Sequence, residues 1–455
     1  MPEKDILESW KEIARYLHRG VRTCQRWERE LGLPVQRLDD SPKARVFANK
    51  EDIDCWLEEK QNIKETILAK ILPKRRKTVF LFGAASVVVV CVVLFLGYYF
   101  LRDRSPTNFE IQGSKFIILN NNNRVIWEYD TGLKDLKTTA IYKDHFQFKK
   151  KTSQASWFYQ PYLIIQDIDG TESIETLFTI QTTTAKNEDQ LICFSDKGDI
   201  LWDYHAGRRM IYGSKEYSAD YNIFAIGVED FEGDGSKEIL VIGRHIPYFP
   251  TQITLLDCKG NKLGEYWHSG GIADYAFIDL DKDGIKEILL SGINNEWHSP
   301  CCAVLDFKQF KGASSQTKDY YTCKDLESGF EKYYLLFPRN SLDLAINLNN
   351  AICGIDYFEN NKVTFLSTYA PVIYELDHSM TLAGIDLTHN FMNDYEKFKK
   401  EGKIHLSLDQ IRQEILSQGI QYFDGEGWTK IATTTKFWKG KVFSSSNEKT
   451  PQDRD

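Results

Sequence analysis

The chain has 455 residues, 42% apolar and 27% charged, so it can form packed cores and is not disordered throughout. Its net charge of −8 argues against a protein that coats nucleic acid along its whole length. Residues 1–77 nevertheless carry 18 basic and 14 acidic side chains, a net of +4 that leaves −12 for the remainder, as expected when two parts of a chain meet different partners.

Two helices joined by a tight turn are predicted near the N-terminus, the second at residues 21–31. Ser9 and Glu12 have the spacing of a capping box at the start of the first helix. The polar face of the second helix carries four long side chains: Arg22, Gln25, Arg26 and Arg29. Arg reads guanine edges and Gln reads adenine edges in the major groove, so this face is typical of a recognition helix. The alternative is a solvated face on an ordinary three-helix module.

A basic β-wing is predicted at residues 35–47, where strand-like segments flank a turn. Three basic side chains there would contact phosphates: Arg37, Lys43 and Arg45. A third helix follows Asn49.

The segments SWKEIARYLHRGVRTCQRWERELGLP and ARVFANKEDIDCWL resemble the winged helix-turn-helix of the MerR and excisionase-like families. The resemblance covers roughly residues 8–58. It implies a small all-α winged helix-turn-helix domain at residues 1–58 that binds double-stranded DNA, with Arg22, Gln25 and Arg26 facing bases and Arg45 facing the backbone. Because a net charge of +4 is modest, tight binding would require a homodimer or tandem sites.

Residues 79–101 contain no charged side chain and are long enough, as a helix, to cross a hydrocarbon core of roughly 30 Å. A signal peptide would lie nearer residue 1, and a soluble core helix of this length rarely lacks charge. The basic cluster at residues 74–77 would hold the N-terminus in the cytoplasm. The sequence therefore predicts a single-pass protein of the cytoplasmic (inner) membrane. A helical juxtamembrane linker would occupy residues 59–78, and the C-terminal domain would be extracytoplasmic.

Short β-branched and aromatic segments alternate with turns from residue 105 onward, which predicts a large all-β domain at residues 105–440. One recurring unit is a hairpin, found at residues 116–132, 191–207 and 253–270. The other is an acidic loop, found as DIDGTESIE at 167–175, DFEGDGSKE at 230–238 and DLDKDGIKE at 279–287. A helical insertion is expected at residues 389–417, and a disordered tail at 441–455.

The second and third acidic loops have carboxylates at positions 1, 3, 5 and 9 and a Gly at position 6, a pattern suited to Ca²⁺. These units resemble the FG-GAP/VCBS repeats of integrin-α-like β-propellers. The resemblance implies one structural Ca²⁺ site at Asp230, Glu232, Asp234 and Glu238, and another at Asp279, Asp281, Asp283 and Glu287. The first loop departs from the pattern at Thr171 and Glu172, so we expect it to hold metal poorly. The alternative is that the Asp-Gly pairs are only turn residues.

The chain shows no nucleophile elbow, P-loop or other catalytic motif, so it is not expected to be an enzyme. The leading hypothesis is a membrane-anchored one-component transcriptional regulator. It would couple cytoplasmic DNA binding to extracytoplasmic sensing of a ligand, glycan or partner protein. The alternatives are a surface adhesion or scaffold protein, whose N-terminal domain tethers DNA or protein without regulating transcription, and an envelope enzyme built on the propeller.

Overall fold

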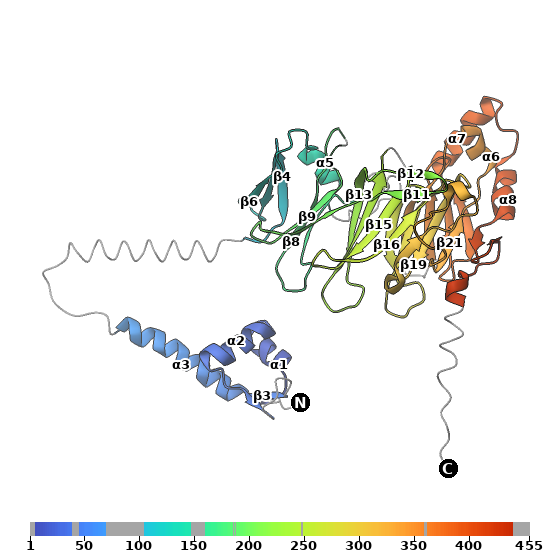
Figure 1. Ribbon diagram of the computed structural model, residues 1–455. Coiled ribbons are helices and arrows are strands. Elements are labelled where there is room, and N and C mark those ends of the chain that lie inside the picture. The colour runs from blue at the N-terminus through green and yellow to red at the C-terminus, as the bar shows by residue number, and fades with distance from the viewer. Residues whose placement is uncertain are drawn as a thin grey trace, which may run out of the picture. The chain divides into compact units, whose positions relative to one another are not determined.

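The computed structural model forms two compact units, Met1–Arg102 and Asp103–Asp455. The structure describes residues 5–38, 45–69, 104–146, 160–184, 186, 188–246, 249–358 and 362–439. Figure 1 shows the helices and strands of both units.

The first unit combines three helices with a three-stranded antiparallel sheet. The helices are α1 (Trp10–Tyr16), α2 (Val21–Leu31) and α3 (Lys50–Ala69), and the strands are β1 (Ile6–Leu7), β2 (Gln36–Arg37) and β3 (Val46–Asn49). The hydroxyl of Ser9 accepts the N–H of Glu12 at the start of α1, whereas the Glu12 carboxylate accepts the N–H of Glu8. Helix α2 ends at Gly32 in the left-handed region, with φ of 68°.

The expectation of an all-α N-terminal domain is therefore wrong. The residues ahead of α1 form β1, which pairs with β3 so that Leu7 lies opposite Ala48, and β3 also pairs with β2. Leu7, Val46 and Ala48 are buried with residues of the helices, because strand residues two apart point to the same side. The wing thus belongs to a sheet that shares the helices' core.

The second unit is mostly β, with mainly antiparallel sheets that follow one another along the chain (Figure 1). The first sheet contains β4 (Asn108–Gln112), β5 (Lys115–Leu119) and β6 (Val125–Asp130). The second contains β7 (Leu163–Gln166), β8 (Glu175–Thr179), β9 (Gln190–Phe194) and β10 (Ile200–His205). A small hairpin, β11 (Met210–Tyr212) and β12 (Lys215–Tyr217), precedes the third sheet.

The third to fifth sheets also begin as meanders of consecutive strands. The third contains β13 (Tyr221–Glu229), β14 (Glu238–His245), β15 (Thr251–Leu256), β16 (Lys262–His268) and the parallel β20 (Lys311–Ala313). The fourth contains β17 (Ile272–Ile278), β18 (Glu287–Asn294), β19 (Ser299–Leu305), β21 (Tyr333–Leu336), β26 (Gln421–Phe423) and β27 (Trp428–Thr429). The fifth contains β22 (Ile352–Phe358), β23 (Lys362–Ser367), β24 (Val372–Leu376) and β25 (Leu382–Leu387).

The first strands of the second to fifth sheets lie side by side. The N–H of Ile226 in β13 donates to the carbonyl of Pro161, just before β7, at 3.0 Å. The hydroxyl of Tyr275 in β17 donates to the carbonyl of Ile226 at 2.6 Å, and the N–H of Ile355 in β22 donates to the Asp274 carboxylate at 2.9 Å. The sheets are therefore arranged like successive blades of a propeller.

The second unit also contains helices, so the expected all-β composition needs correction. They are α5 (Thr139–Asp144), α6 (Ser341–Ile346), α7 (His389–Lys400) and α8 (Leu408–Gln418), with 3-10 turns η2 (Phe307–Gln309) and η3 (Asp319–Tyr321). Helices α7 and α8 fall in the range of the expected helical insertion. They form because Phe391 and Tyr395 on α7, and Ile411 and Ile415 on α8, bury one apolar stripe each in the core of the fifth sheet.

The expected single-pass membrane topology and inner-membrane localisation are also corrected. Among the residues that the structure describes, no helix is long and apolar enough to cross a membrane. The longest of them, α3, has 20 residues, and nine of these are charged, which a hydrocarbon core would disfavour. The segment at 79–101, for which the span is expected, lies outside the described residues, as does the whole of the expected tail at 441–455.

Candidate DNA-binding and metal sites

The polar face of α2 is directed away from the core of the first unit. Arg22, Arg26 and Arg29 are exposed and Gln25 is half-buried, whereas Cys24 on the opposite face is fully buried. Within the described residues, Arg22 and Arg29 form no ion pair, and Arg26 lies 3.8 Å from an exposed Glu30, a separation at which solvent weakens the attraction. The helix thus presents three cationic side chains and one amide to solvent.

The wing residues divide into different roles. Arg37 on β2 forms a two-pronged ion pair with Glu28 on α2, with contacts of 2.8–3.1 Å. The hydrogen bond and charge of Glu28 raise the pKa of Arg37. This pair fixes the wing strand to the second helix, so Arg37 positions the wing. Arg45, directly before β3, is exposed, and Lys43 lies outside the described residues.

The three acidic loops each join the first and second strands of a sheet: β7–β8, β13–β14 and β17–β18. In each loop the Glu at position 9 accepts the backbone N–H of position 2. These pairs are Glu175 with Ile168, Glu238 with Phe231, and Glu287 with Leu280. Burial raises the pKa of all three Glu side chains. The position-9 carboxylate therefore closes the loop by bonding to the backbone of its second residue.

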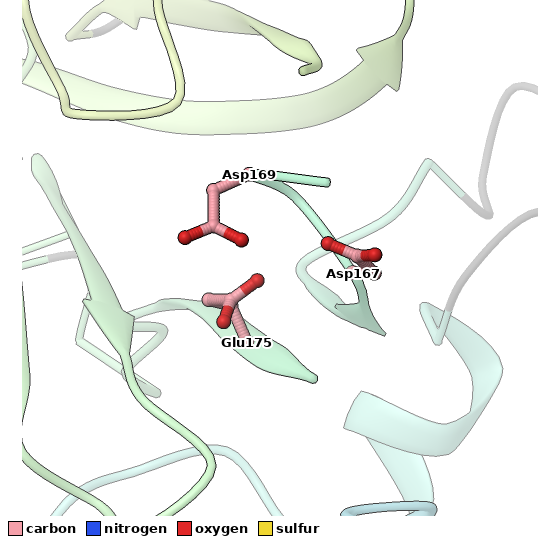
Figure 2. A group of neighbouring side chains, drawn as sticks. All are labelled: Asp167, Asp169 and Glu175. Carbon is pink, nitrogen blue, oxygen red and sulfur yellow. The ribbon is translucent and has the colours of Figure 1, made fainter. Parts of the chain in front are cut away.

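The loop at 167–175 brings Asp167, Asp169 and Glu175 together, with one ligand oxygen from each within 4.8 Å of the others. Figure 2 shows the three carboxylates around a common space, with Glu175 contributed by the start of β8. Both oxygens of Asp167 accept backbone N–H groups, from Gly170 at 2.8 Å and Glu172 at 3.0 Å. The sequence predicts that this loop holds metal poorly, because Thr171 and Glu172 occupy its fifth and sixth positions. The carboxylates at positions 1, 3 and 9 nevertheless form a cluster.

The loop at 279–287 forms a second cluster from Asp279, Asp281 and Asp283, again within 4.8 Å. One buried oxygen of Asp279, Oδ1, has no hydrogen-bond partner in the part of the chain that the structure describes. Glu287, the fourth expected ligand, is bonded instead to the ammonium group of Lys332, which also lies 2.7 Å from Asp281. The structure therefore joins three of the four expected residues and places a lysine against the fourth.

The loop at 230–238 does not form such a cluster among the described residues. Asp230 accepts the N–H groups of Gly233 and Gly235 at 2.6 and 2.9 Å, and Asp234 accepts that of Ser236 at 2.8 Å. Glu232 is exposed, and Glu238 is buried beneath the loop. These carboxylates satisfy the loop's own backbone, a role typical of a turn.

The acidic loops contact one another in a row. Lys237 of the second loop donates its ammonium group to the carbonyl of Asp167 at 2.7 Å. Lys286 of the third loop pairs with Glu229, the residue before the second loop, at 2.8 Å. These contacts join neighbouring sheets at the ends of their first strands. The chemistry of the two clusters, in the loops at 167–175 and 279–287, suits a hard cation such as Ca²⁺, because carboxylate oxygens are its preferred ligands.

Comparisons with known proteins give no family assignment, since no family model and no curated protein sequence matches the chain. Partly similar solved structures include a protein of unknown function from Bacteroides caccae, the V. cholerae biofilm matrix protein Bap1 and the Dos1 propeller. Their sequence identities are 12%, 14% and 8%, and their TM-scores are 0.26, 0.26 and 0.30, respectively. The matches cover 62%, 54% and 61% of this chain and 74%, 42% and 65% of the three structures, so the chain spans less than two thirds of Bap1 and of Dos1. The description of the second unit as mostly β and propeller-like rests on its own sheets.

Proposed function

We propose that the chain is a DNA-binding regulator whose N-terminal unit contacts double-stranded DNA and whose β domain binds a ligand or partner. In this proposal the first unit is a winged helix-turn-helix of the MerR or excisionase-like kind. The observation that carries it is the exposed face of α2, where Arg22, Arg26 and Arg29 project from a helix anchored by its buried opposite face. A recognition helix requires such a face, because its side chains must reach base edges in the major groove.

The wing supports the same proposal. The ion pair between Arg37 and Glu28 holds β2 against α2, which would let the exposed Arg45 contact the DNA backbone beside the groove that α2 enters. Because the first unit is small and its net charge modest, the proposal includes a homodimer on paired half-sites.

The β domain would be an FG-GAP-like propeller stabilised by Ca²⁺. The clusters at Asp167, Asp169 and Glu175 and at Asp279, Asp281 and Asp283 would hold the ion. Bound Ca²⁺ would neutralise carboxylates that otherwise repel one another at the junctions between sheets. Its role would be structural, and the proposal assigns the chain no catalytic step.

Selection of DNA ligands from a random-sequence pool by the full chain tests the proposal, followed by affinity measurements on the selected sequence. The double variant Arg22→Ala/Arg26→Ala should lose at least about tenfold in affinity for that sequence, because each arginine that reads a base contributes roughly 1–3 kcal/mol. The matched control is Lys11→Ala/Arg15→Ala, which removes the same charge from exposed positions on α1.

Equal losses of DNA affinity in the two double variants would mean that only the loss of positive charge matters. That result would contradict base reading by α2. Failure to select any shared sequence would contradict the regulator and favour a scaffold whose N-terminal unit binds protein.

A further inference from the structure

A cavity of about 830 Å³ lies at the end of the blade-like sheets opposite the acidic loops. Its walls come from the starts of first strands, such as Ile272 in β17, and the ends of second strands, such as Arg244 in β14 and Ile293 in β18. The acidic loops occupy the other ends of the same strands. The volume falls in the range of small-molecule sites, which commonly form where several elements converge.

Arg244 places a positive charge in the wall of this cavity, with no ion-pair partner among the described residues. Its guanidinium lies 4.2 Å from the ring centre of Phe224 and donates one N–H to the carbonyl of Ile272 at 2.7 Å. Its Nε is buried without a hydrogen-bond partner, and Arg244 forms no ion pair with any described residue. Burial lowers the pKa of Arg244, yet a guanidinium remains protonated at neutral pH.

The remaining walls combine aromatic rings with polar groups, which include the imidazoles of His145 and His298. Tyr320 and Tyr369 are 51% and 39% exposed, so their rings are accessible to a ligand. Asn349 supplies an amide at the same cavity. The described residues that line the cavity include neither Asp nor Glu, so nothing in these walls offsets the charge of Arg244. Accessible rings favour a ligand with a flat or ring-shaped body, and the unpaired guanidinium favours an anion.

We propose that this cavity binds a small ring-bearing carboxylate, with Arg244 as the contact to the carboxylate and Tyr320 and Tyr369 against the ring. The proposal names a ligand class for the β domain and rests on the proposed regulatory function only for its biological meaning. Both sugar acids and aromatic acids have this chemistry.

Isothermal titration calorimetry on the full chain without DNA tests the site and is independent of DNA binding. D-glucuronate and benzoate serve as the two carboxylates, each compared with a neutral counterpart, methyl glucoside or benzyl alcohol. At least one carboxylate should bind, and about 10- to 100-fold more tightly than its neutral counterpart, because charge-assisted hydrogen bonds to Arg are strong. The carboxylate that binds more tightly shows whether the ligand class is a sugar acid or an aromatic acid.

Variants localise the binding. Arg244→Gln should lose about 10- to 100-fold for the carboxylate and little for the neutral counterpart, whereas Arg244→Lys should lose less because it keeps the charge. The matched control is Arg412→Gln, since Arg412 also donates to a carbonyl, that of Ile385 at 3.0 Å, but does not line the cavity.

Three results would overturn the proposal: no binding of either carboxylate at millimolar concentration, equal binding of carboxylate and neutral counterpart, or equal losses in the Arg244→Gln and Arg412→Gln variants. The comparison within the unaltered chain decides the question even if Arg244→Gln fails to fold.

Discussion

Lys332 places an ammonium group against the acidic loop at 279–287, although it lies 45 residues beyond Glu287 in the sequence. Burial lowers the pKa of Lys332, but its hydrogen bonds to Asp281 and Glu287 raise that pKa above its ordinary value overall. A fixed ammonium competes with a divalent cation for the same oxygens. Among the described residues, no lysine bonds to the carboxylates of the cluster at 167–175. We therefore expect that cluster to bind Ca²⁺ more readily than the cluster at 279–287.

Lys332→Met should raise the Ca²⁺ affinity of the loop at 279–287 severalfold, because it frees Asp281 and Glu287 to bind the ion. Calorimetric titration of the full chain with Ca²⁺ measures the change. Lys286→Met is the control, since Lys286 pairs with Glu229 outside the cluster. An affinity that stays the same in Lys332→Met would show that the lysine does not compete for this site.

His268 predicts a pH dependence of stability in the β domain. It is fully buried, and its Nε2 lies 3.0 Å from the hydroxyl of Tyr334. Burial lowers the pKa of His268 from 6.5 to about 4. The His268 imidazole therefore binds a proton less readily in the folded chain than in the unfolded chain. The resulting stability is fully present above pH 6.5 and is lost as the pH falls toward 4, a change of about 3 kcal/mol.

His268→Asn should flatten the dependence of the unfolding free energy on pH between 6.5 and 4, besides any constant loss from altered packing. Denaturant unfolding at a series of pH values measures the slope. His405→Asn should leave the slope unchanged, since His405 is exposed. An unchanged slope in His268→Asn would assign the acid sensitivity to other groups.

The contact between neighbouring acidic loops depends on Gly170. It has φ of +72°, and a Cβ there would lie 2.7 Å from the carbonyl oxygen of Gly235 in the next loop. Gly132 has nearly the same φ, +70°, but a Cβ there would meet no atom within 4 Å. The two glycines therefore separate backbone strain from close contact.

Gly132→Ala should lower the free energy of unfolding by about 1 kcal/mol, the strain of a left-handed alanine. Gly170→Ala should lower it by about 2–4 kcal/mol, because backbone in the next loop must also move. Thermal or denaturant unfolding of the two variants compares them. Equal losses of unfolding free energy in the two variants would mean that the two neighbouring loops can move apart without destabilising the fold.

The pattern of apolar and turn residues within one short segment is enough to predict the elements that form within that segment. The hairpin pattern at 191–207 corresponds to β9 and β10, and the acidic loops join paired strands because a tight turn and its flanking apolar segments lie within a few residues. The face of α2 followed from helical spacing alone. The sheet in the first unit was missed because β1 has only two residues, too few for a periodic signal.

The residues that complete a site come from distant parts of the chain. The fourth sheet acquires β21, β26 and β27, the last of which lies more than 120 residues after β19, and no spacing within the sheet indicates this. The environment of Arg244 likewise combines Phe224 with Ile272 of the next sheet, so its missing counter-charge becomes apparent only once the sheets are assembled.

The division of the chain into two compact units predicts that they unfold separately. Differential scanning calorimetry of the full chain should show two transitions. Ca²⁺ should raise only the transition of the β domain, because a ligand stabilises the folded unit that binds it, by about 2.7 kcal/mol at 100 times its dissociation constant. Asp167→Asn/Asp279→Asn should abolish the shift, whereas Asp199→Asn, an exposed turn carboxylate, should keep it. A shift that survives the double variant would place the ion elsewhere, and a single transition raised as a whole would show that the two units fold as one.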